Sequence, residues 1–175
     1  MAQHKAALVV LLSAASLNVA SAQSFGNWMF DVADDKSYLY AATSNDSGNI
    51  LGEYCYPEQG SCVWILGLKT SCEKDHTYPV LANTDMGASH LQITCRGLLS
   101  NNLYQYVFTT FDDIDRLVKV GSKIGIAIPL EEDQFRVIRF ALVGATAAIK
   151  NMRSAATKQN TGRGKGKTGT IDQDI

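Results

Sequence analysis

Four cysteines in the centre of the chain constrain its fold more than any other feature. Cys55, Cys62, Cys72 and Cys95 are all the cysteines among 175 residues, and an even number of them is typical of disulfide-bonded domains from oxidising compartments. Three pairings are possible. We favour Cys55 with Cys62, because the segment between them carries a proline and a glycine and should turn the chain back on itself. Cys72 with Cys95 follows by elimination.

A zinc site is the competing interpretation of the same cysteines, since four thiolates can hold one zinc ion. Structural zinc sites contain close pairs of ligands separated by two to four residues. The spacings here are six, nine and 22 intervening residues. The sequence therefore favours two disulfides, and we predict neither a metal site nor another cofactor.

The N-terminus indicates export. A basic start is followed by an apolar stretch over Ala6–Ala20 and then by Ala20-Ser21-Ala22, which is the three-part pattern of a secretory signal peptide. Polar residues interrupt the apolar stretch, which is shorter than the roughly 20 residues of a membrane-spanning helix. We expect a signal peptide over residues 1–22, cleavage after Ala22, and a periplasmic or secreted bacterial protein without a transmembrane anchor.

Short alternating runs of apolar and polar residues follow, separated by turn-forming residues, a pattern typical of an antiparallel β fold. Residues 111–120 fit a short helix or a strand equally well. Residues 142–157 are rich in alanine and favour a helix. We predict one mainly β domain over residues 23–157, an antiparallel β-sandwich or barrel-like fold with a C-terminal helix, and a disordered basic tail over residues 158–175.

The charge distribution excludes a dedicated nucleic-acid binder, which normally has a basic domain. The whole chain has a net charge of −1, and residues 23–149 hold nine basic and fifteen acidic residues. The tail has the opposite sign. It could touch an anionic envelope component, although a solvated end is the more common role of such a run.

No catalytic motif stands out. The chain lacks G-x-S-x-G, and paired cysteines are not available as nucleophiles. His76, His90 and Asp85 could form a metal or acid–base cluster. Their spacing matches no known motif, and an exposed turn explains Asp75-His76 more simply.

The segment Tyr78–Ser89 is the unusual one. It lies inside the predicted Cys72–Cys95 loop, and its proline, glycine and Asn83 suggest a shaped loop rather than a regular element. Such a loop beside aromatic side chains of the strands could present a binding surface. The alternative is that the aromatic residues pack in the core or at an edge. The candidate binding residues are Trp64, Tyr78, Asn83, Asp85 and His90.

The order of features resembles the invasion-associated locus B family of exported bacterial proteins. Phe25-Gly26-Asn27-Trp28 follows the predicted cleavage site, cysteine-bearing strands come next, and Phe140-Ala-Leu-Val-Gly-Ala-Thr-Ala-Ala148 is similar to the family's closing segment. The cysteine spacings and the Tyr78–Ser89 segment depart from it. The resemblance implies a periplasmic β-sandwich-like domain with a role in the envelope or in host interaction, and it supplies no catalytic residues.

Two classes of function remain. The first is a non-enzymatic periplasmic or secreted binding protein whose partner is a protein or an envelope component, including an inhibitor of a secreted enzyme. The alternative is a small envelope hydrolase or metal-dependent enzyme using His76, His90 and Asp85. Paired cysteines and the lack of catalytic motifs favour the first.

Overall fold

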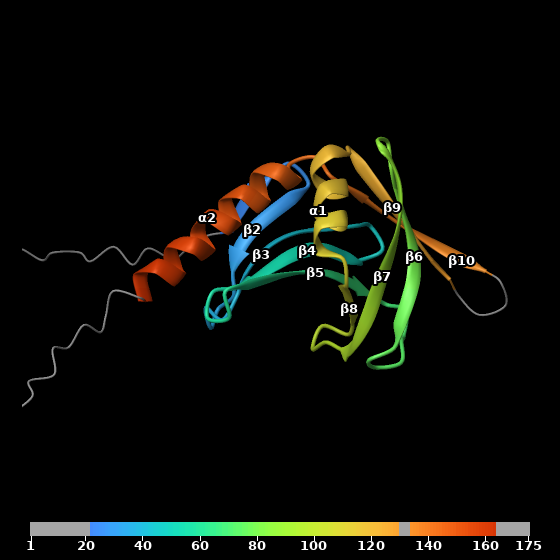
Figure 1. The fold of residues 1–175 in the computed structure, drawn as a ribbon, viewed down its shortest axis with the longest axis horizontal. Coiled ribbons are helices and arrows are strands. Elements are labelled where there is room, and N and C mark those ends of the chain that lie inside the picture. Colours follow the sequence, from blue (N-terminus) through green and yellow to red (C-terminus); the bar gives the residue numbers. More distant parts are fainter. Residues whose placement is uncertain (1–21, 130–133, 164–175) are drawn as a thin grey trace, which may run out of the picture.

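The computed structural model describes residues 22–129 and 134–163, which form one antiparallel β-sheet and two helices (Figure 1). The predicted fold class, mainly antiparallel β with a C-terminal helix, is confirmed. The signal sequence, apart from Ala22, and residues 164–175 of the predicted tail lie outside the described residues. The strands are β1 (Gln23–Phe25), β2 (Trp28–Val32), β3 (Leu39–Ser44), β4 (Ile50–Tyr56), β5 (Ser61–Leu68), β6 (Thr77–Thr84), β7 (Gly87–Leu98), β8 (Tyr104–Phe108), β9 (Lys123–Pro129) and β10 (Phe135–Ala141), and the helices are α1 (Phe111–Val120) and α2 (Ala145–Arg163).

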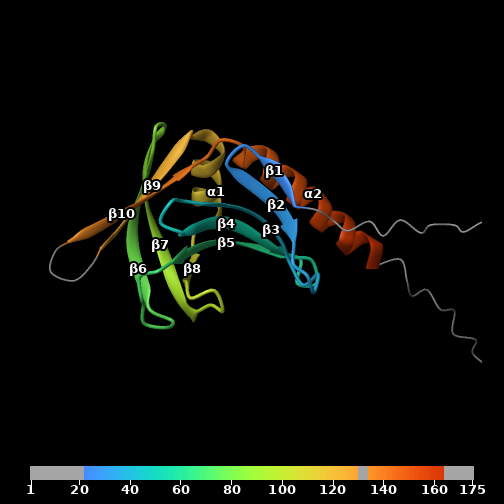
Figure 2. The same cartoon turned by 180° about the vertical axis from the view of Figure 1, so that it is seen from behind.

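The sheet changes direction along its width. Its strands lie in the order β1-β2-β3-β4-β5-β8-β7-β6-β9-β10, all pairs being antiparallel. In Figures 1 and 2, β3, β4 and β5 run across the view while β6 and β7 run upright. The two halves therefore resemble the layers of a sandwich, although they belong to one sheet. β1 and β10 are its two ends and do not pair with each other, so the sheet is not a closed barrel.

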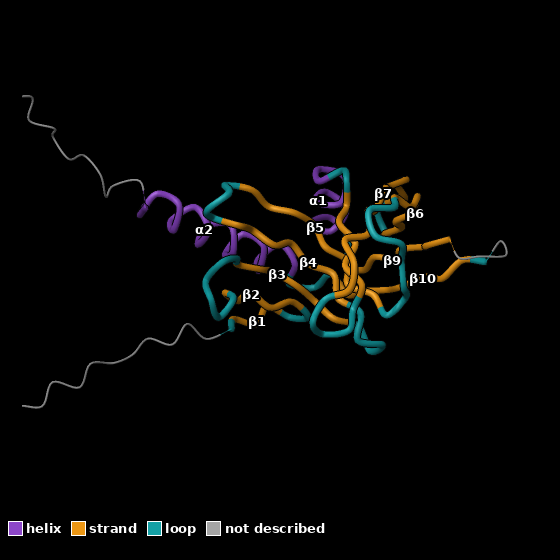
Figure 3. The backbone as a smooth tube through the Cα atoms, turned by 90° about the horizontal axis from the view of Figure 1, so that it is seen from below, coloured by secondary structure: helices purple, strands orange, loops and turns teal. Residues whose placement is uncertain are grey.

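Both helices cover the same face of this sheet, which we call the inner face (Figure 3). Inward side chains alternate along the strands as the period of two requires, and they join the buried helix residues in one hydrophobic cluster. α2 packs on the β1–β4 half, and α1 packs against β5, β7 and β9. The buried helix positions are Ile114, Leu117 and Val118 in α1, and Ala145, Ala148, Ile149, Met152 and Ala156 in α2.

The β1–β2 turn meets the start of α2 in a tight junction. Asn27 donates a backbone hydrogen bond to the carbonyl of Val143 at 3.0 Å, and Trp28 Nε1 donates to Ala141 O at 3.0 Å. Gly144 has φ of +94°, and a Cβ there would lie 1.6 Å from the carbonyl oxygen of Phe25. Only glycine fits this close approach of two backbones. The two sequence segments that carry the family resemblance thus lie together and hold the end of β10 against β2.

The segment Tyr78–Ser89 differs from what its sequence indicates. Residues 78–89 do not form an irregular loop, because β6 and β7 pair from Thr77–Thr94 to Thr84–Gly87 in a regular hairpin. Pro79 is tolerated because β9 pairs with β6 only over Leu81–Thr84, which leaves one side of the strand free at the proline.

The two helices decide one open alternative and correct one expectation. The ambiguous stretch 111–120 is helix α1, with Asp112 and Asp113 in its first turn and Lys119 in its last, where these charges favour the helix dipole. α2 extends to Arg163, so the first part of the predicted tail, residues 158–163, is helical rather than disordered.

Both predicted disulfides are present. Cys55–Cys62 joins directly opposed residues of β4 and β5. Cys72–Cys95 ties the irregular segment before β6 to β7.

Candidate functional site

The structure does not bring the five predicted binding residues together. Trp64 is fully buried on the inner face of β5, with its ring centre 6.1 Å from that of Trp28. Tyr78 packs its ring edge-on against Tyr106 at 6.1 Å, and its hydroxyl accepts a hydrogen bond from the backbone N–H of Glu73. These aromatic residues therefore pack as the core alternative predicted.

The other three predicted residues lie on the β6–β7 hairpin and are exposed. Asn83 and His90 lie on opposite strands of the hairpin, in the pairs Asn83–Ala88 and Leu81–His90, which are two positions apart. Asp85 lies at the hairpin turn and accepts hydrogen bonds from the N–H and the hydroxyl of Ser122, at 2.8 and 2.9 Å. These bonds lower the pKa of the Asp85 carboxyl. Asp85 thus connects the hairpin to the α1–β9 connection.

The proposed cluster of His76, His90 and Asp85 does not assemble. His76 precedes the first residue of β6, whereas Asp85 follows its last. At roughly 3.3 Å per residue, the two are separated by about 30 Å along the strand. The acid–base or metal cluster considered from the sequence therefore has no geometric basis.

A groove of about 470 Å³ on the outer face of the β1–β4 half is the most promising site. Four tyrosines lie together there, with ring centres 5.5–6.1 Å apart: Tyr38, Tyr40, Tyr54 and Tyr56. Tyr40 and Tyr54 are direct cross-strand partners and stack with an angle of 16° between their ring planes. Three of the four, Tyr38, Tyr40 and Tyr54, line the groove. We call this the tyrosine groove.

Small residues beside the tyrosines explain why the surface is concave at the tyrosine groove. Ala42 pairs with Gly52 in the position next to the Tyr40–Tyr54 pair on the same face of the sheet. A Cβ on Gly52 would lie 2.6 Å from that of Ala42, so no larger side chain fits there. Met29, Ile50 and Asn101 also line the groove.

One end of the groove is acidic. A shallow pocket of about 350 Å³ shares Tyr38 and Tyr40 with it and is otherwise lined by Asp31, Asp34, Asp35 and two apolar residues between them. Burial and the Asp31 carboxylate raise the pKa of Tyr40, and burial raises that of Tyr54. Both phenols are therefore neutral near pH 7 and can donate hydrogen bonds.

The tyrosine groove was not predicted from the sequence, although a signal for it was present. Tyr38-Leu-Tyr40 and Tyr54-Cys-Tyr56 each place two tyrosines on one face of a strand. The tyrosines of the two strands meet because of the β3–β4 register, and the sequence alone does not determine that register.

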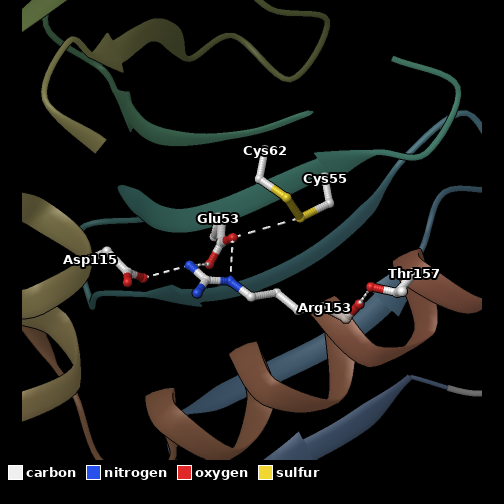
Figure 4. Close-up of a disulfide and its surroundings, with 6 residues drawn as sticks. All are labelled: Glu53, Cys55, Cys62, Asp115, Arg153 and Thr157. Carbon is white, nitrogen blue, oxygen red and sulfur yellow. Dashed lines mark hydrogen bonds and ion pairs between the residues drawn. A yellow bond between two sulfur atoms is a disulfide. The ribbon is translucent and has the colours of Figure 1, made fainter. Parts of the chain in front are cut away.

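A network of charged groups lies on the inner face between the sheet and both helices (Figure 4). Glu53, on β4, is fully buried and accepts two hydrogen bonds of 2.8 Å from Arg153 of α2. Arg153 also donates to Asp115 of α1, at 2.6 Å, and Lys119 donates to the other oxygen of Asp115. Burial raises the pKa of Glu53, and the guanidinium opposes this effect. The network joins three elements in one place.

Glu53, Cys55 and Cys62 form the one group of potential metal ligands found among the described residues. Their ligand atoms lie within 4.8 Å of one another. Both sulfur atoms are joined in a disulfide and are therefore poor metal ligands, since metals bind the thiolate. Glu53, Cys55 and Cys62 therefore suit disulfide chemistry better than metal binding.

Among residues 22–129 and 134–163, neither helix combines the length and apolar character that crossing a membrane requires. No protein-family model matches the chain. The search of curated proteins also gives no match.

The solved structures that resemble the fold include that of invasion associated protein B from Bartonella henselae. The superposition has a TM-score of 0.55 and covers 79% of this chain and 99% of that one, at 12% sequence identity. At this identity the likeness concerns the fold, and it agrees with the fold expected from the family resemblance.

Proposed function

We propose that this chain is an exported, non-enzymatic interaction protein that uses the tyrosine groove to hold a basic segment of a partner protein. The observation that carries the proposal is the continuity of an aromatic groove with an acidic pocket through Tyr38 and Tyr40. A lysine or arginine side chain would enter the acidic pocket, while its neighbours lie along the tyrosine rings.

The chemistry of the surface supports this occupant. Tyrosine is enriched where proteins bind each other, because it offers apolar area together with a hydroxyl. Cations are attracted to aromatic faces and to carboxylates, and the Asp31, Asp34 and Asp35 carboxylates adjoin the rings. The negative charge of residues 23–149 adds long-range attraction for a basic partner.

Two disulfides support export, because they persist in oxidising compartments and are rare in the cytosol. The predicted signal peptide gives the route, and β1 begins at Gln23, the predicted first residue of the mature protein. The resemblance to an invasion associated protein supports a partner on the bacterial envelope or on a host cell. Expression in a bacterium, fractionation and intact-mass measurement test the localisation: a periplasmic species starting at Gln23 is expected, and a cytosolic full-length chain would contradict export.

Titration calorimetry tests whether the tyrosine groove binds a basic segment. It compares a synthetic peptide rich in lysine and arginine with a counterpart in which these residues are replaced by glutamate. We expect the basic peptide alone to bind, with affinity falling as salt rises. Asp34→Asn/Asp35→Asn, which changes only exposed side chains, should weaken binding, and Tyr40→Ala should weaken it by about tenfold or more. Phe135→Ser, an exposed aromatic position on β10, is the matched control. Equal binding of the two peptides, or equal loss in the control, would contradict the proposal.

A further inference from the structure

We propose that Cys55–Cys62 is an exchangeable disulfide, attacked at Cys62 by a dithiol that enters a pocket between the β4–β5 hairpin and α2. Cys72–Cys95 then serves as the structural bond. This inference concerns the inner face of the sheet and is independent of the tyrosine groove on the outer face.

Access is the first requirement for exchange. A pocket of about 240 Å³ is lined by both Cys55 and Cys62, by residues of the hairpin turn, and by Arg153, Thr157 and Asn160 of α2. Cys55 is 1% exposed, whereas Cys62 is only partly buried. Since a thiolate must reach the sulfur that it attacks, Cys62 is the accessible target and Cys55 is the leaving group.

Favourable charge is the second requirement. Arg153 lines the pocket, and its guanidinium attracts an incoming thiolate. Figure 4 shows this side chain running from α2 to Glu53 and Asp115, with Glu53 between the guanidinium and Cys55. The pocket therefore has a cationic side chain in its lining, which is paired with the Glu53 and Asp115 carboxylates.

The third requirement is a group that stabilises Cys55 once the disulfide is reduced. Glu53 Oε1 lies 3.6 Å from Cys55 Sγ. In the disulfide this sulfur has no proton to donate. After reduction, the buried Cys55 thiol can donate its proton to that oxygen, and a hydrogen bond to a charged acceptor is stronger than one to a neutral acceptor. Glu53 thereby stabilises the reduced form as a positioning residue.

Thiol–disulfide exchange at Cys62 takes two steps. The thiolate of the dithiol attacks Cys62 Sγ, a mixed disulfide forms, the Cys55–Cys62 bond breaks, and Cys55 leaves as a thiolate that takes up a proton. The second thiol of the reductant then attacks the mixed disulfide and releases Cys62. The dithiol loses two electrons and two protons and becomes a disulfide, and the two cysteines gain them.

The strand pairing allows this change without unfolding. β4 and β5 remain paired from Ile50–Gly67 to Tyr56–Ser61, on both sides of the disulfide. Cys55–Cys62 closes the shorter chain loop, with a sequence separation of 7 against 23 for Cys72–Cys95. The shorter loop constrains the chain less, so its opening costs less.

The test treats the folded mature protein with glutathione or dithiothreitol, quenches it by alkylation and maps the modified peptides by mass spectrometry. We expect Cys55 and Cys62 to be alkylated while Cys72 and Cys95 stay paired and circular dichroism stays native. With glutathione, the trapped adduct should lie on Cys62. Simultaneous reduction of both disulfides, earlier reduction of Cys72–Cys95, or an adduct on Cys55 would overturn the proposal.

Two kinds of variant test access to the pocket and the role of Glu53 separately. Asn160→Trp, which fills the pocket mouth, should slow reduction at least several-fold, whereas Ser154→Trp, at another exposed position on α2, should not. Glu53→Gln should shift the equilibrium in a dithiothreitol redox buffer toward the disulfide by about fivefold, because a neutral amide is the weaker acceptor. If Glu53→Gln does not fold, the rate comparison of the two α2 variants decides alone, and equal rates would overturn the proposal.

Discussion

Replacing Arg153 by methionine should destabilise the protein by about 3 kcal/mol. Arg153 supplies two hydrogen bonds to the fully buried Glu53. Removing one partner of a buried ion pair costs about 3–5 kcal/mol, because the other charge stays buried and unpaired. The Arg153 side chain is 32% exposed, so water can reach the remaining carboxylate and the lower end of this range applies. Methionine keeps most of the aliphatic packing, which isolates the loss of charge.

Urea unfolding followed by tryptophan fluorescence measures this cost, since Trp28 and Trp64 are both buried and report on the core. In thermal unfolding, the same loss corresponds to a Tm lower by about 6–12 °C. Arg116→Met is the matched control: its partner is Asp113 in an exposed pair, and such pairs contribute about 0–1 kcal/mol. Adding Glu53→Gln to Arg153→Met removes the orphaned charge and should recover part of the stability.

The pH dependence of the stability difference gives a second test of the buried Glu53 charge. Burial raises the pKa of Glu53, and Arg153 counteracts this effect. Without Arg153, the folded-state pKa rises further above the unfolded value, so protonation stabilises the folded variant as the pH falls. The stability difference from the wild type should therefore be largest near pH 7 and shrink toward the ordinary pKa of a glutamate, about 4.3. A difference below about 1 kcal/mol at pH 7, or one constant with pH, would refute the reasoning.

Three further predictions follow from other contacts. Gly144→Ala should lower the free energy of unfolding in urea by about 3 kcal/mol or more, because the new Cβ would overlap the Phe25 carbonyl. Gly48→Ala, also at positive φ but with 3.6 Å of space, should lower it less. Equal losses in the two variants would contradict the tight contact between Gly144 and Phe25. Asp85→Asn should lower Tm at neutral pH, and the difference should begin to shrink as the pH falls below about 3.9 and vanish only below the lowered pKa of the folded carboxyl, where both states are protonated. A difference that persists unchanged at that acid pH would show that charge is not involved. Replacing Cys72 and Cys95 by alanine should cost about 3 kcal/mol by calorimetry, and an unchanged Tm would show that this bond is not structural.

The strands were largely predictable because alternation is a local signal. Ile124, Ile126 and Ile128 alternate in the sequence and lie buried on one face of β9. The first disulfide was also predictable, since the turn between Cys55 and Cys62 brings them together locally. β6 was missed because Pro79 and the Asn83–Gly87 turn residues indicate a loop, and only the partial pairing with β9 makes the proline compatible with a strand.

The candidate site was less predictable because it depends on register and on long-range contacts. Tyr40 meets Tyr54 through strand pairing, and Arg153 meets Glu53 across 100 residues of sequence. Trp64 was assigned to a binding surface, whereas the register places it on the inner face of β5. Gly144 and Phe25, from the two segments on which the sequence resemblance rests, meet in a tight backbone contact, so these segments serve the fold and do not identify a ligand.

Nuclear magnetic resonance of the protein labelled on its tyrosine rings, titrated with the basic peptide, tests the central claim most directly. We predict that the signals of Tyr38, Tyr40 and Tyr54 shift in a saturable and salt-dependent way, while those of Tyr78 and Tyr106, on the inner face of the other half of the sheet, remain unchanged. Shifts spread over all tyrosines, or no shifts with the basic peptide, would contradict the assignment of the tyrosine groove as the binding surface.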